Sequence, residues 1–487
     1  YEDLRSSILR SCSIQSLLHL GRGIFGADFG SVAFVIRRGH PDQTTRAVYR
    51  RLFTSLSEVR ESEEIECLFL QPDFQWFEVA QSSFSEVPRH ALAYWLPDGM
   101  RDTFVRFPPL SQTIPPKQGI KTGNNSRFLR FWWEVSESDT ARGMTSRPAA
   151  KESGKKWFPA QKGGAFRRWY GNDEYVINWS RDGEEIRNYR DPISGKLLSR
   201  PQNIDRLFRG GLTWGTLSIG ACSFRFSPTG FISESKGAIA QNDNLRIVHA
   251  ALGFLNSSVS AALLAAISPT VDFGEGAIGK LPLSPDLLHT RVPDLVAQAI
   301  EISSQDWNRC ETSPNFVSNE LASLADAAVA LRALLLHHRQ TVGIEVGRLR
   351  DIEEEINLLV ATTYGAESVV PVDVPEASVS LVGNPAYRYG PETSVSRTHA
   401  RILEDATADL VSYAVGCMFG RYGLDEPGLI LAHKGATVQD YVAKVPTPTF
   451  APDADNVLPI VDGDWFEGDI VARFRQFLRV AFGDKHF

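Results

Sequence analysis

The feature that most constrains this chain is a long apolar periodicity between Leu321 and Leu359. Apolar residues recur there in steps of three and four, which is the spacing of one face of an α-helix. Gly343 and Gly347 weaken the middle of this pattern, because glycine costs about 1 kcal/mol in a helix interior relative to alanine. The pattern therefore predicts either one continuous helix of roughly 60 Å or two antiparallel helices.

This helical seam cannot be the whole fold. A chain of 487 residues predicts about three hydrophobic cores. With 43% hydrophobic and 22% charged residues, it is not a disordered, collagen-like or disulfide-scaffold chain. The longest apolar stretch, 250–267, contains Asn256 and three serines, so we expect no membrane partner. Five scattered cysteines without a Cys-x-x-Cys pair favour a reducing cytoplasm.

The composition and the expected secondary structure change at three points along the chain. The expected fold class is therefore α/β plus α+β in a multidomain protein. Four parts are expected: an α/β part at 1–99, an irregular α+β part rich in Trp, Tyr, Gly and Arg at 100–290, a helical part at 291–370, and a proline-containing linker with a mixed C-terminal part at 371–487. The chain starts at Tyr1 and enters a helical pattern at once, so we expect the C-terminal part of a longer protein.

Charge is concentrated in the second of these parts. Residues 117–210 contain 19 Lys and Arg against 11 Asp and Glu, whereas the whole chain has a net charge of -7. One basic part within an acidic chain favours a domain that meets a polyanion, and the alternative is a solvated surface with an uneven charge count.

A Gly-x-Gly-x-x-Gly motif at 21–26 imitates a dinucleotide-binding loop. In such a fold a helix starts at the motif, because its N-terminal amides hold the pyrophosphate. Here the strand-like run 31–36 follows instead. We therefore expect two strands around a glycine-rich turn.

The strongest functional signal is the segment 155–172, in which five cations alternate with five aromatic residues around Gly163 and Gly164. Such a mixture suits phosphate contact and base stacking. Downstream, Arg200, Gln202 and Asn203 have side chains that can pair with base edges. Two plain alternatives remain: a Trp-rich core strand with surface arginines, and Asn203 as the N-cap of a short helix at 204–208.

Several segments together give a family resemblance. They are 19–26, 117–124, 156–179, 199–214, 252–256, 352–357, 364–365 and 416–422. Through these segments the chain resembles, almost from end to end, the PglX family of adenine-specific DNA methyltransferases from BREX phage-defence systems. Type IIG restriction-modification enzymes share parts of the pattern.

The resemblance implies a role for each part. Residues 1–99 would be the C-terminal end of a Rossmann-like methyltransferase domain, 100–290 a DNA target-recognition domain, 291–370 a helical spacer, and 371–487 a linker and C-terminal domain. The complete protein would be a site-specific adenine methyltransferase that uses S-adenosylmethionine. This chain lacks the Asn-Pro-Pro-Tyr loop and the donor-binding strand end of such enzymes. Asn384-Pro-Ala-Tyr387 is only a near match, so we expect no catalytic, cofactor or metal site here.

The resulting hypothesis is recognition of a duplex DNA sequence, with a structural interaction module of a defence complex as the alternative. Five cations would position phosphates: Lys155, Lys156, Lys162, Arg167 and Arg168. Base or backbone contacts would come from Gln161, Gly163, Gly164, Tyr170, Arg200, Gln202, Asn203 and Trp214. Expected partners are double-stranded DNA, other defence-system proteins and DNA-mimic inhibitors.

Overall fold

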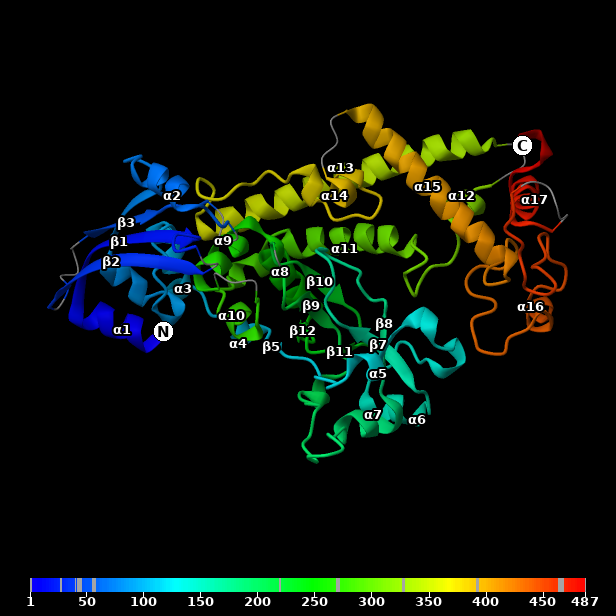
Figure 1. Ribbon diagram of the computed structural model, residues 1–487, viewed down its shortest axis with the longest axis horizontal. Coiled ribbons are helices and arrows are strands. Elements are labelled where there is room, and N and C mark those ends of the chain that lie inside the picture. The colour runs from blue at the N-terminus through cyan, green and yellow to red at the C-terminus, as the bar shows by residue number, and fades with distance from the viewer. Residues whose placement is uncertain are drawn as a thin grey trace.

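Along the longest axis of the molecule, small sheets lie toward the N-terminal end and in the middle, and long helices extend toward the C-terminal end (Figure 1). The computed structural model describes residues 2–486 apart from 27–28, 40, 42–45, 55–57, 219, 269–271, 326–328, 391–393 and 463–467. The N-terminus and the C-terminus lie toward opposite ends of the molecule, and the sheets lie between the N-terminal end and the middle. The architecture is mixed α/β with many helices and several small sheets.

The N-terminal sheet has the strand order β2-β1-β3-β4. Its elements are α1 (Glu2–Ser11), β1 (Cys12–Arg22), β2 (Gly30–Arg38), β3 (Arg46–Arg51), α2 (Ser62–Phe69) and β4 (Trp76–Ala80). Strands β1 and β2 are antiparallel, which confirms two strands around the glycine-rich segment 21–26. Most of β2 is exposed, including Val32, Phe34 and Val35.

Two further sheets form the middle of the molecule. The antiparallel sheet β10-β9-β12-β5 and the mixed sheet β11-β7-β8-β6 are both built within 116–240. Their strands are β5 (Pro116–Lys117), β6 (Leu129–Phe131), β7 (Trp157–Gln161), β8 (Tyr175–Asn178), β9 (Gly211–Gly215), β10 (Phe224–Ser227), β11 (Ile232–Ser233) and β12 (Gly237–Ala240).

Short helices accompany these sheets, and longer ones follow them. The short ones are α3 (Asp98–Arg106), α4 (Leu110–Thr113), α5 (Asn125–Phe128), α6 (Arg147–Glu152) and α7 (Ser180–Arg187). Next come α8 (Leu245–Asn256), α9 (Ser258–Ile267), α10 (Glu275–Ile278), α11 (Val292–Asn308), α12 (Glu320–Ser323) and α13 (Leu331–Tyr364). The C-terminal part contains α14 (Pro385–Tyr389), α15 (Val395–Met418), α16 (Val438–Lys444) and α17 (Ile470–Phe482).

The predicted seam is one continuous helix from Leu331 onward, and the alternative of two antiparallel helices is wrong. Helix α13 has 34 residues, which corresponds to about 51 Å. It runs from the C-terminal end of the molecule toward the N-terminal sheet (Figure 1). The start of the seam differs from expectation, because Leu321 belongs to the separate short helix α12.

The largest hydrophobic core joins parts that the sequence divides. Its buried members include Val87, Leu110, Val292 and Val374, one from each of the four expected parts. These parts therefore share one core, although smaller cores lie in the N-terminal sheet, around β7 and β8, and around α15 and α17. Among the described residues no single helix could cross a bilayer. Only α8 and α9 taken together, bent by 71°, pass that test of length and composition, and they belong to the shared core.

Candidate nucleic-acid interface

Seven of the thirteen predicted contact residues fall on two segments, 161–164 and 200–203. Backbone hydrogen bonds join these to two further segments, 117–121 and 234–237. Lys121 and Arg200 exchange two backbone hydrogen bonds of 3.1 and 2.7 Å. The N–H of Glu234 donates to the carbonyl of Gln161 at 2.8 Å, and a further backbone bond of 3.0 Å joins 117–121 to 234–237. Backbone pairing thus brings together segments from across the basic part of the sequence.

Three of the five predicted phosphate-contacting cations lie at the surface. Lys156 is exposed, and Lys155 and Lys162 are half-buried. The Lys155 ammonium donates to the carbonyl of Ser138, and the Lys162 ammonium lies 4.3 Å from the ring centroid of Tyr175. None of these three lysines forms an ion pair with a residue that the structure describes. The pKa of Glu185 is lowered by its hydrogen bond with Arg127 and also by the charge of Lys156, so Lys156 has one acid in its neighbourhood.

Three exposed cations extend this set. Lys121, Arg200 and Lys236 stand on the meeting segments, and none forms an ion pair among the residues that the structure describes. With the three lysines of the preceding paragraph, six unpaired cations lie on or beside the four segments. We call these six residues the basic face. Lys156 and Lys162 lie just before and just after strand β7. A strand rises about 3.3 Å per residue, so this part of the basic face is roughly 20 Å long.

Gly163 and Gly164 have a packing role in the structure. Gly163 has φ +98°, and a Cβ there would lie 2.9 Å from the carbonyl oxygen of Lys236. Gly164 has φ +125°, and a Cβ would meet the side-chain nitrogen of Asn172 at 2.7 Å. Positive φ and close backbone approach both require glycine. Gly163 therefore allows segment 161–164 to pack against 234–237, and Gly164 allows it to pack against Asn172.

Arg167 and Arg168 are turned into the protein, which corrects their assignment to the phosphate-contacting set. Arg167 is buried, forms an ion pair with Asp306 at 3.8 Å, and stacks 4.6 Å from the ring centroid of Trp307. Arg168 donates to Glu353 at 3.0 Å. Both acids lie in the helical part, on α11 and α13. The two arginines thus dock the segment 155–172 onto the long helices.

The acids at this junction are themselves buried. Trp169 donates its indole N–H to Glu353 at 2.6 Å, and the N–H groups of Val382 and Gly383 donate to Asp306 at 2.6 and 2.8 Å. Burial raises the pKa of Glu353 and of Asp306 above the ordinary carboxyl range. Hydrogen bonds and neighbouring arginines oppose this effect of burial. The junction is therefore a buried polar network that needs all of its partners.

Three other predicted contact residues have little or no exposed surface. Trp214 is fully buried in β9 and donates to the carbonyl of Phe273 at 2.9 Å. Gln161 is 2% exposed. Tyr170 is half-buried, and burial, reinforced by the charge of Asp173, raises its pKa above the ordinary tyrosine range. In this conformation Trp214 and Gln161 do not reach a DNA surface, because they belong to the protein interior.

The predicted base-reading residues lie on segment 200–203, and one of them, Arg200, belongs to the basic face. Arg200 is exposed, whereas Gln202 and Asn203 are half-buried. The amide nitrogen of Gln202 donates to the side-chain oxygen of Gln118 and to the carbonyl of Gly119, and that of Asn203 donates to the carbonyl of Gln118 at 2.9 Å. These bonds fix both amides and leave their oxygens as acceptors. The N-cap alternative is wrong, because Asn203 has φ +52° and its side chain caps nothing in the short 3-10 turn Ile204–Arg206.

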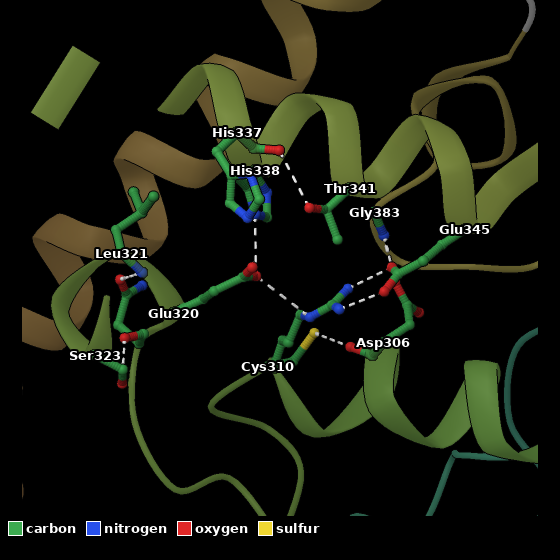
Figure 2. Close-up of polar contacts among 12 residues, drawn as sticks. Asp306, Cys310, Glu320, Leu321, Ser323, His337, His338, Thr341, Glu345 and Gly383 are labelled. Carbon is green, nitrogen blue, oxygen red and sulfur yellow. Dashed lines mark hydrogen bonds and ion pairs between the residues drawn. The ribbon is translucent and has the colours of Figure 1, made fainter. Parts of the chain in front are cut away.

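A second polar network fixes the helical part near the C-terminal end of α11 (Figure 2). Arg309 forms ion pairs with Glu345 and with Glu320, the latter at 3.4 Å. Glu320 also meets Nδ1 of His338 at 3.1 Å, as Figure 2 shows. The hydrogen bond with His338 and the charge of Arg309 lower the pKa of Glu320. This network ties α11, α12 and α13 together.

The residues present do not fit S-adenosylmethionine or a metal. Segment 21–26 runs from the end of β1 toward β2, so among the described elements no helix starts directly after its glycines. Asn384 is buried, accepts the N–H of Ala386 as the N-cap of α14, and donates its amide protons to the carbonyls of Glu376 and Val379. The described residues contain no group of three or more His, Cys, Asp or Glu that could hold a metal ion.

Sequence reasoning missed two kinds of residue. Asp306 and Glu353 are separated from their arginine partners by more than a hundred residues, and no local pattern predicts such pairs. Phe131, Trp133 and Tyr175 form a row of neighbouring rings beside Lys162. The adjacent Trp132 and Trp133 are the visible signal for it, and both lie in the 3-10 turn Trp132–Glu134 that follows β6.

Comparisons with known proteins confirm the family resemblance. The chain is 32% identical to the adenine-specific methyltransferase BrxX of Escherichia coli O9:H4 (strain HS) over 501 aligned residues, which cover 100% of this chain and 38% of the relative. It is 30% identical to the adenine-specific methyltransferase PglX of Lacticaseibacillus casei (strain Zhang) over 492 residues, which cover 98% of this chain and 38% of the relative. The chain thus spans about two fifths of the length of these relatives. No family model matches it.

Proposed function

We propose that this chain, a homologue over its whole length of part of the BREX adenine-specific methyltransferases BrxX and PglX, recognises duplex DNA for such an enzyme. The observation that carries the proposal is the basic face. Six cations without ion-pair partners among the described residues stand on or beside four segments that meet in the basic part of an otherwise acidic chain. A surface of this kind attracts phosphates and releases their counterions.

Within the basic face we assign two roles. Lys155, Lys156 and Lys162 position the DNA backbone, because an ammonium group at a phosphate has no sequence preference. Arg200 and the free amide oxygens of Gln202 and Asn203 read base edges, since Arg pairs with guanine and a carbonyl oxygen accepts from the amino group of adenine or cytosine. Two Gln118-directed hydrogen bonds hold the amides in place before DNA arrives.

We assign the remaining parts by homology and by what each exposes. Residues 1–99 are proposed as the C-terminal end of a methyltransferase domain, since β2 exposes apolar residues such as Phe34 and Val35 that need a covering partner. Residues 100–290 are proposed as the target-recognition domain, 291–370 as a helical spacer, and 371–487 as the linker and C-terminal domain. The large shared core supports a rigid connection among them.

The complete protein is proposed to methylate adenine at a specific DNA site with S-adenosylmethionine as donor, as part of phage defence in the cytoplasm. Other defence-system proteins and DNA-mimic inhibitors are proposed partners. The chain described here would hold the DNA, and donor binding and methyl transfer would need residues that this chain does not supply.

Hydrogen exchange on the chain with and without a 30-base-pair duplex tests the proposal. We expect protection of 117–121, 161–164, 200–203 and 234–237, and none in the N-terminal sheet. Protection elsewhere, or none at saturating DNA, would favour the alternative of a structural interaction module. The buried Arg167 and Trp214, and Arg168 with its ion pair to Glu353, are the specific support for that alternative.

A further inference from the structure

A row of aromatic rings crosses the edge of the sheet β11-β7-β8-β6 next to the basic face. Phe131 in β6 stands opposite Tyr175 in β8, and their ring centroids are 4.7 Å apart. Trp133 stacks on the other side of Phe131 at 4.7 Å, with ring planes only 3° apart. The Lys162 ammonium closes the row, 4.3 Å from the Tyr175 centroid. We call Trp133, Phe131, Tyr175 and Lys162 the aromatic row.

Trp133 is the open end of this row. It is 39% exposed, whereas its neighbour Trp132 is 4% exposed and donates its indole N–H to the carbonyl of Thr312 at 2.8 Å. The indole N–H of Trp133 has no hydrogen-bond partner among the described residues. One tryptophan of the pair therefore anchors the core, and the other presents ring surface and a free donor to solvent.

One end of the row carries a cation that a phosphate can contact. Lys162 has no acidic partner in the described part of the chain, and it belongs to both the basic face and the row. The nearest acid in sequence to Trp133 is Glu134, whose carboxylate accepts the backbone N–H of Phe131 at 2.8 Å. Glu174, beside Tyr175, is half-buried, and burial raises its pKa. Lys162 therefore supplies a cation at the Tyr175 end of the row, and the exposed carboxylate of Glu134 lies beside Trp133 at the other end.

We propose that the aromatic row stacks an unpaired base of the DNA whose backbone Lys162 contacts. A ring face can meet a base face only when that base has left the duplex stack, because stacked bases expose their edges alone. A flat aromatic surface with a neighbouring cation is the combination that binds single-stranded nucleic acid. This inference rests on the proposed DNA-binding function and specifies the DNA conformation that part of the surface accepts.

The row also fits the chemistry of base modification. An enzyme that acts on a base in duplex DNA must take it out of the stack, which leaves unpaired nucleotides near its recognition surface. A stacking site on the recognition part would stabilise such an opened strand without reading its sequence. The row thereby adds a contact that the basic face alone does not provide.

Fluorescence of a 2-aminopurine base tests the proposal. The probe is a 12-nucleotide single strand with 2-aminopurine at its centre, and the comparison is the same strand in duplex form. We expect the full chain to bind the single strand and to quench its fluorescence. Trp133→Ala should remove most of the quenching and weaken single-strand binding about 5- to 150-fold, with an unchanged salt slope. Trp133→Phe should retain most of both effects.

Trp76→Ala is the matched control, because Trp76 is 48% exposed and lies in the N-terminal sheet. Trp133→Leu replaces Trp133→Ala if the latter does not fold. Single-strand binding and quenching equal to wild type in a folded Trp133 variant would overturn the proposal, as would equal weakening by Trp76→Ala. If the proposal is overturned in this way but the wild-type chain still binds duplex DNA with a salt-dependent affinity, only the role of the aromatic row is refuted. If it binds neither probe, the proposed function fails as well.

Discussion

Removing Glu353 is expected to uncouple the proposed recognition part from the long helix α13. Glu353 is 3% exposed and accepts hydrogen bonds from Arg168 at 3.0 Å and from Trp169 at 2.6 Å. In Glu353→Ala the half-buried guanidinium of Arg168 loses its charge partner, and the buried indole N–H of Trp169 loses its acceptor. Both losses occur where water cannot easily replace the carboxylate.

The magnitude follows from the burial of this network. Breaking a buried ion pair by removing one partner costs about 3–5 kcal/mol, because the other charge is left without compensation. Glu353→Gln keeps an acceptor for the Trp169 indole, so it loses mainly the charged hydrogen bond and should cost about 1–3 kcal/mol. Glu355→Ala is the matched control two residues away, because Glu355 pairs with Arg291 at the surface and such pairs contribute about 0–1 kcal/mol.

Hydrogen exchange resolved by segment is the assay, since the chain has several cores and can open locally. Glu353→Ala should raise the exchange rate in 163–173 and in the middle of α13 by at least a hundredfold, and Glu355→Ala by less than tenfold. The salt dependence of DNA binding should keep its slope, because Arg168 is not a phosphate contact in this structure. Equal exchange in the two variants would refute the role of Glu353 as a buried partner.

Four further substitutions have expected outcomes. Burial raises the pKa of Asp173 from 3.8 to about 6, so the folded state binds this proton more tightly than the unfolded state does. The free energy of unfolding should therefore fall by about 3 kcal/mol as pH rises from 4 to 6. In Asp173→Asn the midpoint of urea unfolding should change less over this pH range. Gly163→Ala should cost more than about 1 kcal/mol because of its positive φ, whereas Gly343→Ala, in an open helical position, should stabilise by about 0.4–1 kcal/mol in thermal unfolding. Gln202→Ala should weaken binding to the cognate site by about 1–3 kcal/mol and to random duplex by little, and equal losses on both would make Gln202 a structural residue.

Local sequence patterns predicted the strands around segment 21–26 and the long helix α13. The glycine-rich segment 21–26 lies between antiparallel strands, as the strand-like run after it indicated. Helix α13 continues through Gly343 and Gly347 because Val342 and Val346 on the same stretch are buried in the shared core. That burial, at about 1.5–3 kcal/mol per large side chain, outweighs about 1 kcal/mol for each glycine.

Side-chain direction in the segment 155–172 could not be predicted in the same way. Arg168 and Lys162 are both cations beside aromatic residues, yet one meets Glu353 and the other faces solvent. The difference is decided by a carboxylate 185 positions along the chain, which no local pattern contains. Trp214 is comparable, because its burial depends on how β9 packs between β10 and β12.

The salt dependence of duplex binding tests the central claim most directly. If the six cations of the basic face neutralise five or six phosphates, log K should fall with log salt at a slope of about -5. Lys156→Ala and Lys162→Ala should each reduce the steepness by about one, and the exposed lysine Lys434, outside the basic face, serves as the control for a lost charge. A slope near zero for the wild-type chain, or an equal change from Lys434→Ala, would contradict DNA binding through this surface.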